Sequence, residues 1–544
     1  MPHAAALPGR VRLEGARFWT ADPAHPWAQS LDIHDGRIAA VDAPARPDTP
    51  VITLPGTVVT PGLVDAHLHL TLGAATLLQL DLSAVRSRTA FEAAIHTAHA
   101  ALPPGAWLCA HGWDEANWGG ERPTLAWLRS AADRPTVAYR ADQHACLVNS
   151  AVLHMLGNTP CPEGGVIESD AAGQPTGMLL EQAAWQLINP RIPQPAPEAL
   201  RNAVVGACAQ ANACGVTSVC SMEYAAQAHS VLEWLRAHQP DALSLRVRIT
   251  LLDRSWPLDF SYGAHFANDE LLSVIGYKAF VDGTLGSRTA RLLEPYTDTP
   301  GHFGLLVEHA AAGDGRLAAW MRAVVERGFS PSVHVIGDAA LRVALEAAEQ
   351  ADPARLLRIE HAQTIHAEDL SRLAGRAVSM QPLHKTGDAV IAPSRLGSAR
   401  MDRFFPFRSV VNAGARLAFG SDWPIVSLDP RPGIRAAITG LDANGQPCCP
   451  AQNLTLDEAM HAYTAGAASV LRDPAIGTLG PGAHADLCMW QDDPWTHDWQ
   501  RSVPRVAATV LGGRMVWSSS SATEVANAWG ALRPEPRQES MVTA

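Results

Sequence analysis

The sequence predicts an α/β fold: a TIM-like (β/α)8 barrel with an insertion after its first strand and a flanking β-sandwich built from both chain ends. Short apolar runs alternate with Ala- and Leu-rich helical patterns through the middle of the chain. Further β-type runs with tight-turn signals stand at both ends, and a long segment, 70–214, separates the first apolar run of the middle region from the second. Such alternation is typical of βα units around a parallel sheet.

Eight apolar runs are the candidate barrel strands. They comprise residues 62–69, 215–219, 244–252, 272–282, 331–338, 357–362, 376–382 and 416–422. A barrel of eight βα units places its active site at the carboxyl ends of its strands, so the side chains that end these runs are the first candidates for function.

The two chain ends are predicted to form one β domain. Asp35-Gly36 and Gly512-Gly513 stand between alternating apolar runs, and such dipeptides favour hairpin turns. The expected division of the chain is a β-sandwich at 1–58 and 475–517, a barrel at 59–474 with an inserted subdomain at about 100–190, and a polar, poorly ordered tail at 518–544.

The composition narrows the function classes. The chain has 544 residues, 47% of them hydrophobic, and a formal net charge of −12, without a basic block that would suit nucleic acid. No apolar stretch is long enough to span a membrane, and the N-terminus does not resemble a signal peptide. Nine scattered cysteines without a Cys-x-x-Cys pair fit reduced thiols. We therefore expect a cytoplasmic protein with a small-molecule partner and neither a nucleic-acid nor a membrane partner.

His67-Leu68-His69, at the end of the first run, is the most specific local feature. Residues i and i+2 of a strand point the same way, so the two imidazoles should lie side by side. Neutral imidazole is a preferred ligand of zinc-like metals. The alternative is coincidence, because the chain contains 22 histidines.

Other strand ends carry metal-competent side chains: Lys278, His334, His361 and Asp422. Taken singly, each histidine could be structural, and Asp422 could cap the following helix. Together with His67 and His69 they supply enough nitrogen and oxygen ligands for one metal ion or two.

Lys278 is also unusual in a chain that prefers arginine, since Lys278 and Lys385 are the only lysines among 42 basic residues. A lysine in such a chain indicates a position where a guanidinium does not suffice. The alternative is that Lys278 pairs with Asp282 or another nearby carboxylate.

Several longer stretches resemble the amidohydrolase superfamily and, within it, the YtcJ-like group that includes N-substituted formamide deformylases. They begin at Pro61, Gly112, Asp142, Gly177, Tyr277, His334, Arg358, Gln381 and Phe419, and read PGLVDAHLH, GWDEANW, DQHACLVN, GMLLE, YKAFVDGTLGSRTA, HVIGD, RIEHAQ, QPLH and FGSDWP. The resemblance spans most of the chain and implies a metal-dependent (β/α)8 barrel with a flanking β-sandwich. A homodimer is the state that such enzymes commonly form.

The resemblance also implies roles for individual residues. His67, His69 and Asp422 would bind the more buried metal, and His334 and His361 would bind the second. Lys278 resembles the lysine that many superfamily members carboxylate so that it bridges both ions. The implied cofactor is a divalent metal, with zinc as the expected ion, in one or two copies.

The function expected from these residues is hydrolysis of a C–N bond in an amide or N-substituted formamide by a metal-activated hydroxide. Asp422 would accept the proton and return it to the leaving amine. The alternatives are a carbamate, lactone or other ester hydrolase on the same site, and a non-catalytic scaffold.

Substrate contacts are expected from five further residues. His144 and Arg288 would assist at the carbonyl oxygen, Trp113 and Trp118 would wall an apolar pocket, and His384 would line its mouth. Each has a structural alternative: a satisfied histidine, an ion-paired arginine, two core tryptophans and a solvated histidine. His111, Ser221 and Glu223 depart from the group's pattern, and their roles stay open.

Overall fold

The central sheet contains the eight predicted strands, all parallel and in sequence order. The computed structural model describes residues 9–263, 269–311, 313–353 and 355–531. The strands are β6 (Leu63–Leu68), β13 (Val216–Glu223), β14 (Arg246–Leu252), β15 (Leu272–Phe280), β16 (Ser330–Val335), β17 (Arg358–His361), β18 (Ala377–Met380) and β19 (Arg416–Phe419). The predicted barrel is confirmed.

Contacts between the first and last strands nearly close the sheet. After β19, the Asp422 N–H donates to the His67 carbonyl at 2.6 Å, and the His69 N–H donates to the Trp423 carbonyl at 2.8 Å. Gly420 permits this approach, because a Cβ atom there would lie 2.5 Å from the His67 nitrogen. Two segments far apart in the sequence are thereby held together at the carboxyl ends of the strands.

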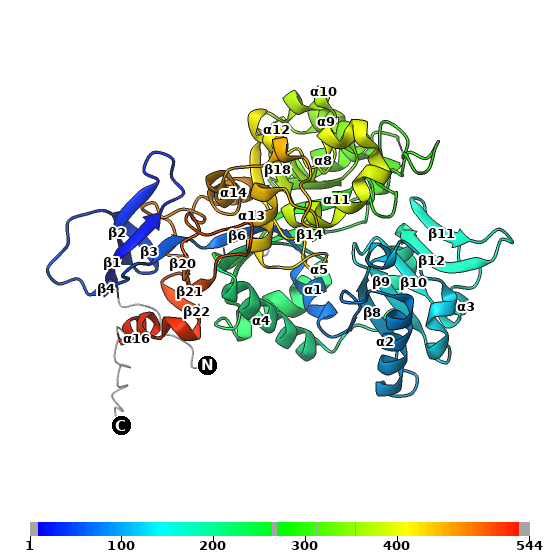
Figure 1. Ribbon diagram of the computed structural model, residues 1–544, viewed down its shortest axis with the longest axis horizontal. Coiled ribbons are helices and arrows are strands. Elements are labelled where there is room, and N and C mark those ends of the chain that lie inside the picture. Colours follow the sequence, from blue (N-terminus) through cyan, green and yellow to red (C-terminus); the bar gives the residue numbers. More distant parts are fainter. Residues whose placement is uncertain (1–8, 264–268, 312, 354, 532–544) are drawn as a thin grey trace.

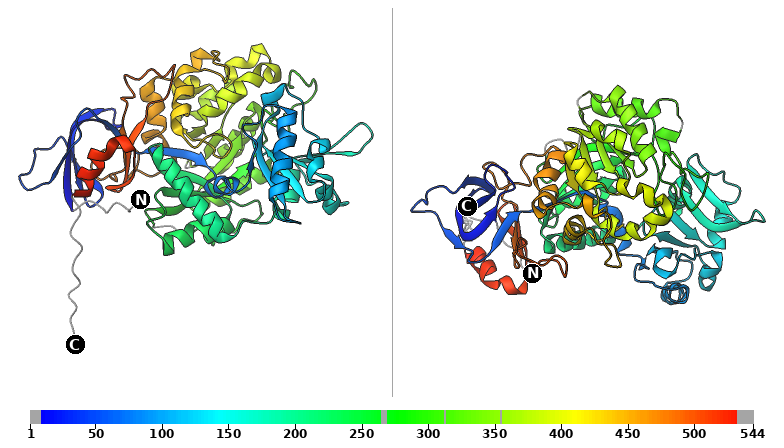
Figure 2. Two further views of the ribbon diagram at one scale, coloured as in Figure 1. Left: turned by 60° about the horizontal axis from the view of Figure 1, so that its bottom comes forward. Right: turned by 45° about the horizontal axis from the view of Figure 1, so that its top comes forward.

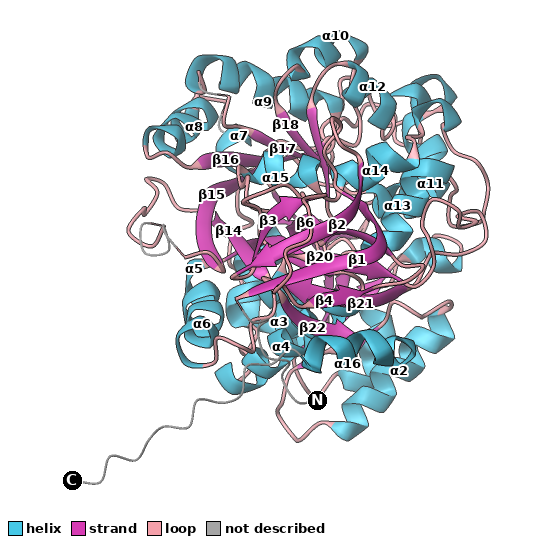
Figure 3. Cartoon of the chain, turned by 90° about the vertical axis from the view of Figure 1, so that its left-hand side faces the viewer, coloured by secondary structure: helices cyan, strands magenta, loops and turns pink. Residues whose placement is uncertain are grey.

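Helices surround the barrel strands (Figure 3). Those with one buried face include α4 (Pro197–Ala213), α8 (Arg316–Glu326), α9 (Asp338–Ala351), α11 (Pro382–Leu396) and α13 (Pro430–Thr439). In α9 the buried residues Leu341, Ala344, Leu345 and Ala348 follow the i, i+3, i+4, i+7 spacing of an amphipathic helix. Shorter helices are α1 (Leu70–Thr76), α5 (Ala225–Gln227), α6 (Trp234–His238), α7 (Glu308–Ala311), α10 (Ala367–Leu370), α12 (Phe407–Asn412), α14 (Leu456–Ala462) and α15 (Ala465–Leu471).

The two chain ends form a second sheet, shown at the left of Figure 1 in blue and red. Its order is β22-β21-β20-β5-β1-β2-β3, with β4 also paired to β1, and β20 joins the C-terminal strands to β5. The bounds are β1 (Arg10–Trp19), β2 (Trp27–His34), β3 (Arg37–Val41), β4 (Val51–Thr53), β5 (Val58–Pro61), β20 (Leu487–Trp490), β21 (Val506–Leu511) and β22 (Arg514–Ser518). The predicted hairpins at Asp35-Gly36 and Gly512-Gly513 join β2 to β3 and β21 to β22.

Part of the predicted polar tail is helical instead. Helix α16 (Thr523–Ala531) packs on this terminal sheet through Trp529, which is 2% exposed and donates from its indole nitrogen to the Gly513 carbonyl. The polar composition of the tail gave no indication of this apolar contact. The remaining residues of the tail, 532–544, lie outside the described part of the chain.

The insertion after the first barrel strand contains a third sheet at the opposite end of the barrel from the terminal sheet (Figures 1 and 2). Its order is β11-β12-β10-β9-β8-β7. The bounds are β7 (Leu80–Asp81), β8 (Leu108–Trp113), β9 (Thr136–Arg140), β10 (Ala145–Val148), β11 (Gly165–Ser169) and β12 (Pro175–Glu181), with helices α2 (Arg88–Ala101) and α3 (Ser150–Leu156). This sheet starts at Leu80, ahead of the predicted boundary near 100.

The barrel interior contains a buried cation. Arg358 on β17 is 1% exposed and donates to the Ala66 carbonyl on β6 at 3.0 Å and to the Cys220 sulfur on β13 at 3.1 Å. It also forms an ion pair with Glu360 at 3.0 Å. Within the described part of the chain, no helix is long and apolar enough to cross a membrane.

A buried ion pair joins the terminal sheet to the barrel, and its loss should destabilise the protein. Arg246 on β14 forms two hydrogen bonds, of 2.7 and 3.0 Å, with the carboxylate of Asp486, and both side chains are at most 4% exposed. Asp486→Ala leaves the guanidinium buried without its partner and should lower the free energy of unfolding by about 3–5 kcal/mol. Thermal unfolding followed by circular dichroism measures this effect.

The matched control is Asp492→Ala, which removes the more exposed pair of Asp492 with Arg505. It should cost less than about 1 kcal/mol. Equal unfolding temperatures for the two variants would contradict a bridging role for Arg246 and Asp486.

Candidate metal centre

The six predicted metal ligands line one cavity at the carboxyl ends of the barrel strands. Ligand atoms of His67, His361 and Asp422 all lie within 4.8 Å of one another. His67 Nε2 and His69 Nε2 are 3.3 and 3.2 Å from Asp422 Oδ1. The side chains therefore come together from three parts of the barrel: β6, β17 and the segment after β19.

Free lone pairs at this point fit a bound cation. Among the described residues, His67 Nε2 and His361 Nδ1 are buried and have no hydrogen-bond partner. An unsatisfied buried nitrogen is costly, so it is expected where a ligand completes the site. Imidazole nitrogens with one carboxylate are a donor set that suits zinc-like divalent ions.

His334 and Lys278 lie beside these three residues. The His334 and His361 rings are 4.4 Å apart between centroids, and the His334 N–H donates to the Gly283 carbonyl at 3.1 Å. The Lys278 side chain is buried on β15 and shares the cavity. The arrangement provides a second group of donors next to the first.

Burial sets the protonation of these groups. It lowers the pKa of His334 and of His361 well below the usual value, so both imidazoles are neutral and able to bind metal. Burial also lowers the pKa of Lys278 to about 8. Burial would raise the pKa of Asp422, but the adjacent imidazoles of His67 and His69 lower it well below the usual range.

Unusual backbone conformations aim two of the ligands. His361 has φ 72° and Asp422 has φ 59°, in the left-handed region that non-glycine residues rarely adopt. Glu360 already faces the barrel interior, so regular strand alternation would direct His361 away from it. The positive φ at the strand end changes this direction, and such strain is typical of functional sites.

Glu360 orients His67. It is fully buried, and its Oε2 atom lies 2.7 Å from His67 Nδ1 while Ser332 donates to Oε1. Burial would raise the pKa of Glu360, but Arg358 and His67 lower it strongly, so the carboxylate is ionised. It accepts the Nδ1 proton of His67, which leaves the Nε2 lone pair facing Asp422.

Asp65 fixes the backbone of the same two segments. Its carboxylate accepts the His67 N–H at 3.0 Å and the Ser421 N–H at 3.0 and 3.1 Å. One buried side chain therefore holds together the two backbone segments that carry His67 and Asp422.

Ser221 and Glu223, whose roles were open, hold the first turn of α1. The Leu70 N–H donates to the Ser221 hydroxyl at 2.8 Å, and the Thr71 N–H donates to Glu223 at 3.0 Å. Because α1 begins directly after His69, these contacts position that candidate ligand. His111 is half-buried near Asp81, and burial lowers its pKa.

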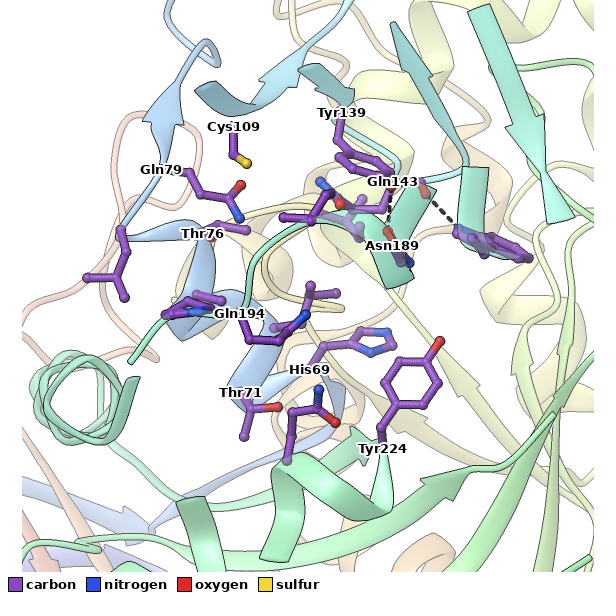
Figure 4. Close-up of a pocket in the computed structure, with 18 of the residues that line it drawn as sticks. His69, Thr71, Thr76, Gln79, Cys109, Tyr139, Gln143, Asn189, Gln194 and Tyr224 are labelled. Atoms are coloured by element: carbon purple, nitrogen blue, oxygen red, sulfur yellow. Dashed lines mark hydrogen bonds between the residues drawn. The ribbon is translucent and has the colours of Figure 1, made fainter. Parts of the chain in front are cut away.

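The cavity has a volume of about 780 Å³ and two kinds of wall. The six candidate ligands lie on the wall of the cavity. Polar groups around His69 include Thr71, Gln143, Asn189, Gln194 and Tyr224 (Figure 4). Apolar residues of α1, the insertion and the neighbouring segments also line the cavity: Leu72, Ala75, Leu78, Ala98, Leu102, Trp107, Ile192 and Pro193.

Two of the predicted substrate contacts lie beside the candidate metal ligands. His144 lines the cavity, its Nδ1 is 2.8 Å from Glu181 Oε2, and its ring is 5.1 Å from that of His334. His384 Nε2 is 3.7 Å from Asp422 Oδ2, and its side chain is only 9% exposed. Whether either residue binds substrate stays a prediction.

The other three predicted contacts lie elsewhere, which corrects the expectation. Trp113 is 1% exposed and donates to the Ala138 carbonyl, and Trp118 packs beside Trp127, so both belong to the core of the insertion. Arg288 forms two hydrogen bonds with Asp298 and closes a loop. The small insertion sheet needs large apolar side chains for its own core, and this need accounts for both tryptophans.

Sequence reasoning missed several residues of the site. Asp65 and Glu360 carried a readable signal, because each is an acidic residue within two positions of a ligand on the same strand. Trp107, Trp185 and Arg254 also line the cavity, and nothing in their local sequence indicates it.

Comparisons with known proteins agree with this geometry. A profile described as the amidohydrolase family matches residues 50–517. The chain belongs to the amidohydrolase family. It is 32% identical to the putative amidohydrolase YtcJ of Bacillus subtilis over 87% of this chain and 92% of that protein, and 27% identical to the N-substituted formamide deformylase of Arthrobacter pascens over 88% and 93%. The predicted superfamily and group are confirmed.

The fold of this amidohydrolase also matches solved structures. An uncharacterized metal-dependent hydrolase from Pyrococcus horikoshii is 26% identical and has a TM-score of 0.72, with coverage of 90% of this chain and 99% of that one. A further relative by sequence is the Arabidopsis thaliana protein LONG AFTER FAR-RED 3, which is 31% identical over 94% of this chain and 92% of its own length.

The family match and the similarity to solved hydrolases together show that the chain is a metal-dependent hydrolase of this family.

The orienting role of Glu360 predicts an effect on metal binding. Glu360→Gln replaces the anionic acceptor of the His67 proton by a neutral amide and should weaken metal affinity by roughly 10–100-fold. Competition with a chromogenic chelator measures the affinity, and circular dichroism checks the fold.

The control is Glu368→Gln on α10, where the carboxylate is 74% exposed. Ser332→Ala, which removes one hydrogen bond to Glu360, should cause a smaller loss. Unchanged affinity in a folded Glu360→Gln protein would rule out this role.

Proposed function

We propose that the protein hydrolyses a C–N bond of an amide, with N-substituted formamides as the first candidates. The observation that carries the proposal is the position of Asp422, which contacts His67 and His69 on the wall of a large cavity. An ionised carboxylate beside imidazole groups can both bind a cation and exchange a proton with a substrate. The similarity to the formamide deformylase supports this choice of bond.

Six residues would hold the metal. His67, His69 and Asp422 would bind one divalent ion, with zinc as the expected species, and His334 and His361 would bind a second. Lys278, carboxylated on Nζ, would supply a further oxygen ligand. A bound divalent ion supplies two things: a lower pKa for a water molecule and polarisation of the substrate carbonyl.

The protein's own groups would move the proton. Asp422 would accept a proton from the attacking water and then donate it to the leaving amine, so that one carboxylate acts as base and then as acid. The leaving nitrogen needs this proton because a deprotonated amine is a poor leaving group.

His144 would donate a hydrogen bond to the carbonyl oxygen as negative charge develops there. Burial lowers the pKa of His144, but the neighbouring carboxylates Glu181 and Asp142 outweigh it, and the pKa is raised overall. This favours a protonated imidazole, which is a stronger donor toward an oxyanion.

The apolar wall would bind the nitrogen substituent. Leu72 on α1 and Leu78 just after it line the cavity together with Trp107 and Ile192, and the two leucines are 40% and 49% exposed. Covering exposed apolar surface favours binding by about 25 cal/mol per Å² removed from water. We therefore propose an aromatic or long aliphatic substituent.

A substrate panel with matched side groups separates this proposal from its alternatives. Formamides, longer acyl amides, carbamates, lactones and esters that carry one apolar group are incubated with the metal-loaded protein. Highest kcat/KM for formamides or amides supports the proposal. Preference for carbamates or esters would replace it, and no turnover with full metal content would favour a scaffold.

Removal of the proton carrier should abolish turnover. Asp422→Asn keeps the size of the side chain but cannot accept the proton, and we expect kcat to fall by about 10²–10⁴-fold. Metal analysis accompanies the kinetics, because Asp422 is also a proposed ligand. The control, Asp498→Asn, changes a surface aspartate that is 59% exposed. Full turnover in Asp422→Asn would exclude the proposed proton transfer.

Carboxylation of Lys278 should depend on pH and bicarbonate. Only the neutral amine reacts with carbon dioxide, and with a pKa of about 8 roughly half of Lys278 is neutral at pH 8 but about one part in a hundred at pH 6. Bicarbonate should therefore speed metal reloading of the apoprotein at pH 8 and have little effect at pH 6. Lys278→Met should show no bicarbonate effect, and equal responses of both proteins would contradict carboxylation.

A further inference from the structure

Arg254 lies on the wall of the same cavity and has no part in the proposed chemistry. It follows β14, and its side chain is 20% exposed. Among the described residues, Arg254 and the proposed metal ligand Lys278 are the only lysine or arginine side chains that line the cavity.

Neighbouring groups hold the guanidinium in one place. Its Nη1 group forms an ion pair with Glu308, whose other carboxylate oxygen accepts the Phe280 N–H at 2.8 Å. Its Nε–H donates to the Tyr224 hydroxyl at 3.3 Å. The guanidinium carbon lies 4.4 Å from the ring centre of Trp185 and 4.8 Å from that of Phe280. A cation held this way loses little entropy when it binds a ligand.

Part of its hydrogen-bonding capacity is unused. A guanidinium has five N–H donors. Within the described part of the chain, only Glu308 and Tyr224 accept hydrogen bonds from Arg254, and no protein group accepts from Nη2. The remaining donors are therefore available to a ligand in the cavity.

The acidic residues of the cavity wall are engaged elsewhere. Glu223 accepts hydrogen bonds from Thr71 and Ser221, and Asp142 is bound by Arg140. Asp422 contacts His67 on β6 and His69 directly after this strand. Among the lining carboxylates, none competes for the free edge of Arg254.

Aromatic contacts connect this cation to the metal centre. The Phe280 ring is 5.1 Å from the His334 ring, and the Trp185 ring is 4.7 Å from the His144 ring. Arg254 is thus one aromatic side chain away from two residues that would surround the scissile carbonyl.

We propose that Arg254 binds a carboxylate of the substrate, so that the protein acts on amides that also carry a carboxylate group. The inference rests on the proposed amide hydrolysis and narrows its substrate class. The fork of a guanidinium fits the two oxygens of a planar carboxylate. A single arginine already paired with Glu308 suits one negative charge better than the two of a phosphate.

The test compares substrates that differ only in this group. N-substituted formamides with one apolar skeleton end in a carboxylate, in the neutral carboxamide or in a phosphonate, and kcat/KM is measured with the metal-loaded protein. We expect the carboxylate to exceed the carboxamide by about tenfold or more, equivalent to ~1.4 kcal/mol. The difference should lie mainly in KM, because the group is remote from the reacting bond.

Substitution of the arginine should remove this preference. In Arg254→Met the ratio between carboxylate and carboxamide should fall to about one, and in Arg254→Lys it should be intermediate. A ratio within one protein is insensitive to the amount of folded enzyme. The control is Arg236→Met, which removes a surface arginine paired with Asp269 outside the cavity, and it should keep the wild-type ratio.

Calorimetry with a non-hydrolysable analogue, in which a methylene group replaces the amide nitrogen, measures binding without turnover. Hydrolysis without carboxylate preference, preference for the phosphonate, or preference that persists in Arg254→Met would each overturn the inference and leave amide hydrolysis standing. Carboxylate-dependent binding that is lost in Arg254→Met, without hydrolysis of any compound, would instead overturn the proposed function and support the anion site.

Discussion

The site depends on one buried carboxylate, that of Glu360. It joins the Arg358 cation inside the barrel to the imidazole of His67 at the cavity. The charges of Arg358 and Glu360 are both buried, so each stabilises the other. Loss of either residue would leave an uncompensated charge in the core. The contacts of Arg358 with β6 and β13 couple strand packing to the orientation of the ligand. Fold stability and site geometry are therefore not independent in this protein.

The two additions to the barrel contribute unequally to function. The terminal sheet packs near the start of β14 through Arg246 and Asp486 and supports the barrel from the side away from the ligands. The insertion instead supplies His144 to the cavity wall. Together with the segment that follows it, the insertion also supplies other residues of this wall, including Trp107 and Trp185. Differences in substrate range within this family are expected to arise in such segments, because the strand ends carry the candidate metal ligands.

Local sequence was sufficient to predict residues whose role follows from strand position. The barrel strands and their six ligand candidates could be predicted because apolar runs and terminal polar residues are local patterns. Trp113 and Trp118 were predicted wrongly for the same reason. A tryptophan in a motif has the same local pattern whether it faces a cavity or the core of its own sheet, and only packing separates the two.

The sequence by itself determined the fold class, the order of the strands and the presence of a metal-binding set of residues. Tertiary structure alone decided which side chains share the cavity. Arg254, Trp185 and His334 are brought together from three chain segments by barrel closure and by the position of the insertion. Likewise, the aim of His361 and Asp422 depends on left-handed backbone conformations that their residue types do not favour. Long-range packing imposes these conformations, so no local pattern could reveal them.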